Sequence, residues 1–504
     1  MNHAFPKLQR SPLFIPVLFF MAGIGVANFY FIAFVFIHFY IDIVYWQQRK
    51  IVPNSSFVRW RINFFILAFS FFLLGFLIRS HREETSQVVN EKIELDSVLL
   101  TFHDGVRFSK RGAWTIAQLH FNKNNIDVLV NMDSAVASVL EKGDSLYFNS
   151  TSVYPLLKAE RRPNSWESYL IRQGVSAKIY VKNKQEYICY KNKTWYYFAY
   201  NFMHRKILKS QLSTSSKSLL LSLLIGDRGY IDKETKDKFS EVGVSHILSV
   251  SGLHVGIIYL IISFVIGLIW NKHAYVSLGI ILVLIWFYCW MVGFEAAVLR
   301  SALMFSLHAI GNAIGRKSSL LHTTSLSAFI ILVINPNFLY DIGFQLTYGA
   351  MLGIIFLMPL LQDKVKVKYS FLKPVIDLML LSLAVQITLL PLLIYHFQTL
   401  PIYFMVANLL VVPATALIMY GGIVFLILPE NQISNTLLDL LVLVNDACCT
   451  MICEWPYPLV FIKEISPLNI CLYSFVVISV VLYWATKMNA FLFVSCLILV
   501  LLFV

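Results

Sequence analysis

The sequence predicts a polytopic α-helical membrane protein with a small β domain inserted near its N-terminus. Hydrophobic residues make up 58% of the 504 residues and charged residues only 14%, and the mean hydropathy is +0.68. Soluble domains carry about 25% charged residues, so this composition excludes an ordinary soluble fold. Apolar runs of about 20 residues recur along the chain, as helices that cross a bilayer require. One long fall in hydropathy, from Arg79 to about Ser218, locates the water-facing part.

Residues 1–79 are predicted to hold three spans. The apolar stretch from Pro12 to Trp46 is too long for one span, so we expect a hairpin that turns near Asn28. The third span runs from Ile62 to Ile78. The hairpin lacks a small-residue cleavage site and leads straight into another span, so we expect it to stay in the mature protein. Residues 244–504 form the main membrane body, with spans predicted at 246–270, 274–292, 296–314, 320–335, 342–361, 375–394, 402–428, 436–453, 466–485 and 488–504.

Residues 80–193 have the pattern of a β domain. Apolar and polar residues alternate in Trp114–Phe121 and Ile126–Met132, which is the period of a half-buried strand. Turn signals separate several such segments, which predicts a small barrel or sandwich of about five strands. These signals are Asp104-Gly105, Arg111-Gly112, Asn124-Asn125 and Gly143-Asp144.

Residues 194–243 are predicted to hold helices at the membrane interface. The segment Thr194–Lys209 is rich in Trp, Tyr and Phe and ends with Arg205, Lys206 and Lys209. Aromatic rings and basic side chains together are typical of a helix that lies at the level of the lipid headgroups.

The positive charge indicates the orientation of the chain. The formal net charge is +13, which fits nucleic acid, anionic lipid, or only the Lys and Arg that fix membrane topology. Basic residues gather in alternate loops, at 7–10, 49–61, 272, 316–317 and 364–373. When these loops are placed in the cytoplasm, the β domain falls outside it.

The cysteines predict neither a disulfide framework nor a metal site. Of the seven, only Cys189 lies in the β domain, which excludes an internal disulfide there. Cys448, Cys449 and Cys453 sit in an apolar run without a nearby set of His or carboxylate ligands, so we interpret them as small packing residues. No metal and no cofactor are expected.

Polar side chains recur inside the predicted spans, where they are costly and usually face a bundle interior or a water-filled path. In the predicted topology many lie toward the outer ends of their spans, on the side of the β domain, where they could line the mouth of one cavity. The candidate channel residues of this kind are His246, Ser249, Ser251, Gly252, His254, Glu295, Arg300, Asp341, Gln345, Gln386 and Asn408.

Each of these residues also has a structural interpretation. Glu295 and Arg300 can form a salt bridge near the headgroups, and Gln386 and Asn408 can hydrogen-bond neighbouring helices. Gly252 can serve close helix packing. Ser251 and His254 are three residues apart and share a helix face, which also fits a nucleophile with its base, although no carboxylate can be assigned to orient the histidine.

The motifs and their order resemble the ComEC family of competence proteins. The stretches that carry the resemblance are LLIGDRGYID (Leu223–Asp232), HILSVSGLHVG (His246–Gly256), the turn Gly293–Arg300, NPNFLYDIGFQLTYGA (Asn335–Ala350) and the series Gln386, Pro391, Phe397, Asn408 and Pro413. RRPNSWESYLIRQGV (Arg161–Val175) resembles the end of the extracytoplasmic domain of that family. The first motif adds Asp227 and Arg228 to the candidate channel residues.

The resemblance implies a channel of the cytoplasmic (inner) membrane that admits single-stranded transforming DNA. It also implies an OB-like fold for the extracytoplasmic β domain, a fold that binds single strands with a basic groove and stacked aromatic rings. The candidate DNA-binding residues are Trp114, Tyr147, Tyr154, Arg161 and Arg162, although most aromatic residues of a small barrel belong to its core.

The longest family members carry a metallo-β-lactamase-like domain with an HxHxDH motif, which does not occur in this sequence. We therefore expect no enzymatic activity and a separate nuclease. No GxxxxGK[ST] motif occurs either, so we expect a cytoplasmic motor or DNA-binding protein as partner, together with an extracytoplasmic DNA receptor. A homo-oligomer is compatible with the sequence.

Three other functions remain open at this point. An intramembrane Ser/His hydrolase predicts covalent labelling of Ser251 by a serine-directed probe. A small-solute transporter predicts an internal repeat, and none is visible. An assembly scaffold of the cell envelope predicts that DNA binding is absent even at low salt.

Overall fold

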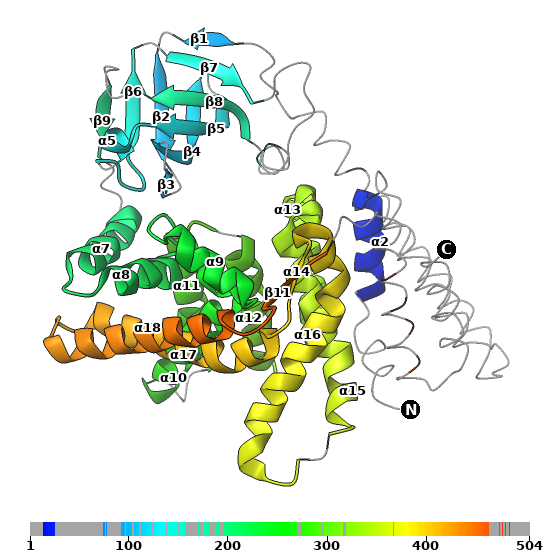
Figure 1. Ribbon diagram of the computed structural model, residues 1–504. Coiled ribbons are helices and arrows are strands. Elements are labelled where there is room, and N and C mark those ends of the chain that lie inside the picture. Colours follow the sequence, from blue (N-terminus) through cyan, green and yellow to red (C-terminus); the bar gives the residue numbers. More distant parts are fainter. Residues whose placement is uncertain are drawn as a thin grey trace. The chain divides into compact units, whose positions relative to one another are not determined.

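The computed structural model describes residues 14–25, most of residues 92–191 and nearly all of residues 195–462, with short gaps and a few isolated positions elsewhere. The chain divides into two compact units (Figure 1). Unit 1 comprises Met1–Thr85, Leu303–Leu400 and Val460–Val504, and unit 2 comprises Ser86–Ala302 and Pro401–Leu459.

A β domain built on one mixed sheet opens unit 2. Its strands are β1 (Ile93–Leu95), β2 (Val98–Phe102), β3 (Arg107–Ser109), β4 (Gly112–Phe121), β5 (Asn124–Met132), β6 (Ser145–Phe148), β7 (Thr151–Pro155), β8 (Val175–Val181) and β9 (Ile188–Tyr190). The strand order is β1-β7-β8-β5-β4-β2-β6-β9, with β3 also paired to β4. Among the described strands, all pairs are antiparallel except β5 with β8.

Alternate side chains of these strands form the core of the domain. Leu100, Ala117, Val128, Val130 and Ile179 are almost fully buried in one cluster. Their neighbours along each strand point to the other face, as the period of two requires. The two strands predicted from alternation, Trp114–Phe121 and Ile126–Met132, are confirmed as parts of β4 and β5.

The prediction of a closed barrel of about five strands is wrong. The sheet has nine strands, and among the described strands β1 pairs only with β7 and β9 only with β6, so the ends of the sheet do not meet. Each of these end strands is only three residues long. Such short strands offer few backbone groups for closing a barrel, and they are also a common way to limit exposed sheet edges.

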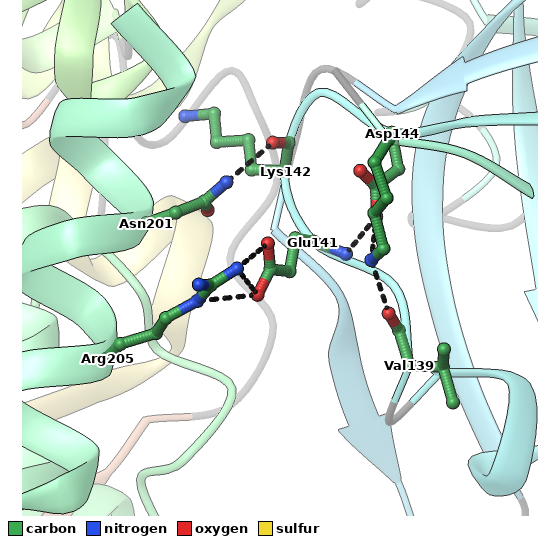
Figure 2. Close-up of polar contacts among 7 residues, drawn as sticks. Val139, Glu141, Lys142, Asp144, Asn201 and Arg205 are labelled. Atoms are coloured by element: carbon green, nitrogen blue, oxygen red, sulfur yellow. Dashed lines mark hydrogen bonds and ion pairs between the residues drawn. The ribbon is translucent and has the colours of Figure 1, made fainter. Parts of the chain in front are cut away.

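A loop of the β domain, Glu141–Asp144, docks onto α7 (Trp195–Lys209), as Figure 2 shows. Arg205 of α7 donates hydrogen bonds of 2.6 and 2.7 Å to the two carboxylate oxygens of Glu141. Lys142 is 7% exposed, and its ammonium lies 4.7 Å from the centre of the Tyr200 ring and donates to the carbonyl of Met291. The β domain is therefore attached to α7 and to the end of α11 (Ala274–Val292) by charged groups that are paired.

The other helical elements of unit 2 follow the β domain and return late in the chain. They are α8 (Thr214–Leu220), the π-helix η1 (Leu221–Ile225), α9 (Lys233–Glu241), the 3₁₀-helix η2 (Ser245–Leu248), α10 (Gly252–Ile269), α17 (Phe404–Ile427) and α18 (Gln432–Cys453). α12 (Ala296–Ala313) passes from unit 2 into unit 1.

Unit 1 is helical in the part of it that the structure describes. It contains α2 (Phe14–Gly25), α13 (Leu320–Ile334), η3 (Pro336–Tyr340), α14 (Ile342–Leu352), η4 (Gly353–Leu357), α15 (Met358–Gln362), η5 (Ser370–Leu372) and α16 (Lys373–Phe397). α2 packs against α13 through Phe20, Ile24 and Leu332, all fully buried. The short strands β10 (Thr399–Pro401) and β11 (Leu459–Phe461) form a separate two-stranded sheet.

Several helices are long and apolar enough to cross a membrane, which confirms the predicted helical membrane body. Among the described residues these are Tyr275–Val292, Ile342–Gln362, Ser370–Phe397, Phe404–Ile427 and Gln432–Cys453. Gly252–Leu268 and Leu320–Ile334 are shorter apolar helices. The turn predicted near Asn28, nearly all of the span 62–78 and most of the spans 466–485 and 488–504 lie outside the described residues.

Candidate functional site

The motif GDRGY places Asp227 directly after a helix end. Gly226 closes η1 with φ of +83°, a left-handed conformation that costs a glycine little. The Asp227 carboxylate accepts a hydrogen bond from the backbone of Gly229 and lies 3.2 Å from Nε2 of His204 in α7. Asp227 therefore ties the motif back to α7, while Arg228 beside it is half-buried.

The motif HILSVSGLHVG forms η2 and the start of α10. His246 is exposed in η2, and its carbonyl accepts a hydrogen bond from the Ser249 hydroxyl. Ser222 of η1 donates a hydrogen bond to the carbonyl of Leu248 at 2.5 Å, which joins η1 to the end of η2. A Cβ at Gly252 would lie 2.9 Å from Oγ of Ser301 in α12, so the glycine permits the close approach of α10 and α12.

Ser251 and His254 contact each other, as their spacing predicts. The Ser251 hydroxyl lies 2.9 Å from Nδ1 of His254, and the Ser251 backbone N–H donates to the same nitrogen at 3.1 Å. The Ser251 carbonyl accepts the first helical hydrogen bond, from Val255. This is one half of a capping box, in which the third helical side chain accepts the N–H of the N-cap residue, with histidine in the place that Glu or Gln usually takes.

The cap fixes the tautomer of His254. Because Nδ1 accepts, the ring proton must sit on Nε2, which is buried and has no hydrogen-bond partner among the described residues. The side chain is fully buried. A hydrolytic histidine would need an orienting carboxylate at that second nitrogen, and none of the described carboxylates bonds to it.

Replacing His254 separates the cap from the hydrolase alternative. We expect His254→Ala to destabilise the purified protein by about 1 kcal/mol, as loss of a cap does, and His254→Gln to recover most of that loss. Thermal unfolding in detergent measures both. A glutamine amide can accept the Ser251 N–H but cannot act as a base, so labelling of Ser251 by a serine-directed probe that disappears in His254→Gln would support the hydrolase instead.

The remaining candidates of unit 2 lie on α12 and α17. Arg300 is 2% exposed and is among the most buried large side chains of the chain. Asn408 is half-buried in α17. Glu295 lies outside the described residues, so the predicted pair of Glu295 with Arg300 is untested.

Unit 1 brings together three polar residues around the start of α14. Asp341 caps this helix by accepting the backbone N–H of Phe344 at 2.8 Å. The Gln345 amide donates to the carbonyl of Leu339, and its oxygen lies 3.0 Å from Nε2 of His396 in α16. Gln386, also in α16, has a buried Nε2 that bonds to none of the described residues.

The candidate DNA-binding residues differ in their surroundings. Trp114 packs against the buried cluster of Leu129, Leu156, Leu170 and Val175, so it belongs to the packing of the β domain. Tyr147 is half-buried between β2 and β9, opposite Leu99 and Ile188. Arg161 and Arg162 lie outside the described residues.

Tyr154 belongs to a group of exposed or half-buried aromatic and basic side chains that we name the tyrosine face, made of Lys92, Tyr154, Lys178 and Tyr180. The Tyr154 and Tyr180 rings meet edge to face, 5.6 Å apart, and the Lys92 ammonium lies 5.9 Å from the Tyr154 ring. Lys178 is paired opposite Tyr154 across β7 and β8, and Tyr180 is 47% exposed. The sequence reasoning missed three of these four residues, although the alternation in VSAKIYV puts Lys178 and Tyr180 on one face of β8.

A cavity of about 740 Å³ lies between the docking loop and α7. Its charged groups are largely paired, because Lys191 bonds to Asp144, Arg205 bonds to Glu141, and Lys206 bonds to the carbonyls of Leu426 and Leu428. The stacked rings of Phe198 and Phe202 also line it.

The Glu141–Arg205 pair makes the docking of the β domain sensitive to acid. Hydrogen bonds from Arg205 lower the pKa of Glu141 below its ordinary value. A carboxyl with a lowered pKa contributes stability above its ordinary pKa of about 4.3, and the contribution is lost as the pH falls through the lowered value. Because the Arg205 side chain is 59% exposed, we expect a contribution below about 1 kcal/mol.

We therefore expect Glu141→Gln to speed hydrogen exchange in the docking loop at pH 7, with the difference from the wild type shrinking as the pH falls below about 4.3, the ordinary pKa of a glutamate. Glu94→Gln is the control, since Glu94 also forms an ion pair, with Lys92, but lies outside the loop. Equal exchange in the wild type and Glu141→Gln at pH 7 would show that the ion pair does not hold the loop.

Five helices long and apolar enough to cross a membrane, counted among the described residues, and an inserted β domain fit the class of multi-pass membrane proteins. Residues 223–487 match the family described as "Competence protein". This match covers more than half of the chain, so the chain belongs to the competence protein family, which is associated with DNA uptake. The resemblance found in the motifs is thereby confirmed.

Two curated proteins show the extent of the similarity. The chain is 27% identical over 288 residues to ComE operon protein 3 of Bacillus subtilis, which covers 55% of this chain and 36% of that protein. It is 24% identical over 256 residues to Recombination protein 2 of Haemophilus influenzae, which covers 47% of this chain and 32% of that protein. The chain thus matches about a third of the length of these relatives. No solved structure matches it.

Proposed function

We propose that this chain is a channel component through which single-stranded transforming DNA crosses the cytoplasmic membrane during natural competence. The observation that carries the proposal is the competence-family match over residues 223–487, which includes α10 to α18 and every motif from HILSVSGLHVG onward. The membrane-length helices of that region supply the span that a conduit needs.

The tyrosine face supports a role for the β domain in holding the strand. Stacking of bases on aromatic rings and neutralisation of phosphates by lysines are the two interactions that bind single strands without regard to sequence. Tyr180 offers an exposed ring and Tyr154 a half-buried one, and Lys92 and Lys178 stand beside them. We assign this face, on an extracytoplasmic β domain, as the place where the incoming strand is held.

Polar side chains near the N-terminal ends of helices in both units support weak, repeated contacts with the DNA strand inside the membrane. A polyanion moves through a pore only if no single site holds it too tightly. Histidine, serine and amide side chains such as the exposed His246 and the half-buried Gln345 suit that requirement better than rows of lysine. In this proposal the complementary strand is degraded by a separate nuclease, and the pulling force and the first capture come from a cytoplasmic motor and an extracytoplasmic receptor.

The proposal is tested by transformation of a deletion strain with labelled DNA. DNA bound outside the membrane and DNA in the cytoplasm are scored separately, with the intact chain, His254→Gln or His254→Ala supplied back. We expect DNA bound outside the membrane to persist in the deletion strain, while cytoplasmic DNA and transformants vanish. The intact chain is expected to restore the cytoplasmic DNA and the transformants. Unchanged entry in the deletion would refute the channel, and loss of outside binding as well as entry would favour a scaffold.

A further inference from the structure

The helices α17 and α18 form a hairpin in unit 2. Their composition alone predicts that each crosses the bilayer, whereas their neighbours in the structure indicate another placement. Both are long and apolar enough to cross, and the sequence predicts spans at 402–428 and 436–453. Figure 1 shows the two helices side by side, with α8 and α9 along α18. Those neighbours decide where the hairpin can lie.

Both ends of α17 are tied to the segment that runs from α7 to α9. At its C-terminal end, Lys206 of α7 donates to the carbonyls of Leu426 and Leu428 at 3.0 and 2.8 Å. At its N-terminal end, Phe404 and the preceding Pro401 pack on Gly243, directly after α9, where a Cβ would lie 2.6 Å from the proline ring. The two ends of a 24-residue helix therefore meet the last turn of α7 and the residues just after α9.

α18 is tied to the same segment along its length. The Glu430 carboxylate, just before it, accepts the backbone N–H of Gln211 at 2.8 Å, and Asp439 accepts that of Ser213 at 3.1 Å. Near the other end, Asp446 lies 3.7 Å from the Lys238 ammonium of α9. Three carboxylates of the hairpin thus face polar groups that precede α8 or belong to α9.

The segment from α7 to α9 cannot itself cross a bilayer. Its apolar part, Thr214–Ile225, has 12 residues and, at about 1.5 Å per residue, reaches only about 18 Å of the roughly 30 Å needed. The segment also folds back on itself after η1, because Asp227 contacts His204 of α7. α9 carries exposed Glu234, Lys236 and Asp237, so it lies in water or among headgroups.

We infer that the α17–α18 hairpin lies in the plane of the membrane, at the surface that carries α7 and α9, and crosses the bilayer at neither helix. The polar face of α18 and the packed face of α17 meet the segment from α7 to α9, and a continuous apolar side is left for the acyl chains. The side chains of that side, 45% to 82% exposed, are Leu417, Val424, Ile427, Ile433, Leu437 and Val444. An amphipathic element of this kind binds a lipid surface through its apolar area.

The inference goes beyond the DNA proposal and does not depend on it. If it holds, Asn408 and the proline at 413 belong to a surface hairpin around the bundle and not to the wall of a pore. The inference lowers the number of predicted membrane crossings by two. Because two is an even number, the segments after the hairpin stay on the same side of the membrane.

Cysteine labelling from one side of the membrane tests the inference. In a background whose seven cysteines are replaced by alanine, single cysteines are placed at Gln432, where α18 begins, at Tyr457 after α18 and at Asn149 in the β domain, all exposed positions. We expect an impermeant maleimide to label all three to the same extent in intact spheroplasts, with no gain after permeabilisation. Labelling of Gln432→Cys from the side opposite to Tyr457→Cys would establish two spans and overturn the inference.

A second measurement does not depend on the accessibility of single cysteines to an impermeant reagent. The pairs Ser213→Cys with Asp439→Cys and Lys238→Cys with Asp446→Cys are treated with a short bifunctional maleimide in native membranes of the full chain. A hairpin in the membrane plane allows both pairs to cross-link in the same preparation. If one pair cross-links efficiently and the other does not, α18 leaves the surface at one end and the inference is wrong.

Discussion

Replacing Tyr154 and Tyr180 together by alanine is expected to weaken binding of single-stranded DNA to the purified chain by about tenfold or more. Stacking of a base on an aromatic ring is worth about 1–3 kcal/mol, and 1.4 kcal/mol is tenfold in affinity. The two rings are 5.6 Å apart on neighbouring strands, so one short stretch of nucleotides can use both. Fluorescence anisotropy with a labelled oligonucleotide, on the full chain in nanodiscs, measures the effect.

Tyr190 supplies the matched control for this prediction. It is 54% exposed on β9, at the opposite end of the sheet from β1 and β7, so Tyr190→Ala removes an exposed ring of the same type. We expect the affinity of Tyr190→Ala to stay near that of the wild type. In addition, Lys178→Ala is expected to lower the slope of affinity against salt by about 0.7, the value for one phosphate contact with a single strand. Equal losses in Tyr190→Ala and the double variant would remove the tyrosine face as the binding site.

Replacing Gly353 by leucine is expected to cause the largest loss of folded protein. A Cβ at Gly353 would lie 2.7 Å from the Thr388 hydroxyl oxygen and 2.9 Å from the carbonyl oxygen of Ala384, both in α16. The backbone carbonyl cannot rotate away, so η4 and α16 must separate. Overpacking of this kind costs about 1–3 kcal/mol or more, enough to lower the amount of protein several-fold in cells.

Gly279→Leu is the matched control for the packing prediction. Gly279 also lies inside a membrane-length apolar helix, α11, but a Cβ there meets no atom within 4 Å. Quantitative blotting of membranes and the unfolding temperature in detergent should separate the two variants. If Gly353→Leu accumulates and unfolds like Gly279→Leu, the close approach of η4 and α16 is not needed for folding.

Local patterns in the sequence predicted the elements with strong periodicity and missed those that depend on distant pairing. The alternation in β4 and β5 is plain because ten and nine residues repeat it. β1, β3 and β9 have three residues each, too few for any period to stand out. The parallel pairing of β5 with β8 joins segments more than forty residues apart, and no local signal marks it. Barrel closure depends on those same distant pairs.

Contacts within one helical turn could be predicted from local spacing in the sequence, whereas contacts between helices could not. The spacing of Ser251 and His254 predicts their contact, which the structure confirms at 2.9 Å. Its meaning as a helix cap required knowing that α10 begins at Gly252. The contact of Gln345 with His396 spans 51 residues, and that of His204 with Asp227 joins a helix to a loop, so neither has a signature in the sequence. The membrane placement of α17 and α18 likewise follows from their neighbours and not from their hydropathy.

The most direct test of the channel is to trap DNA inside the chain while it crosses. Transforming DNA that carries a photoreactive thymidine analogue in one strand is added to competent cells expressing the chain, and the cells are illuminated within the uptake period. The account predicts cross-links between single-stranded DNA and this chain, including its membrane helices, that decline as label reaches the cytoplasm. Cross-links confined to the β domain, or to a different membrane protein while entry proceeds, would contradict the claim that this chain is the conduit.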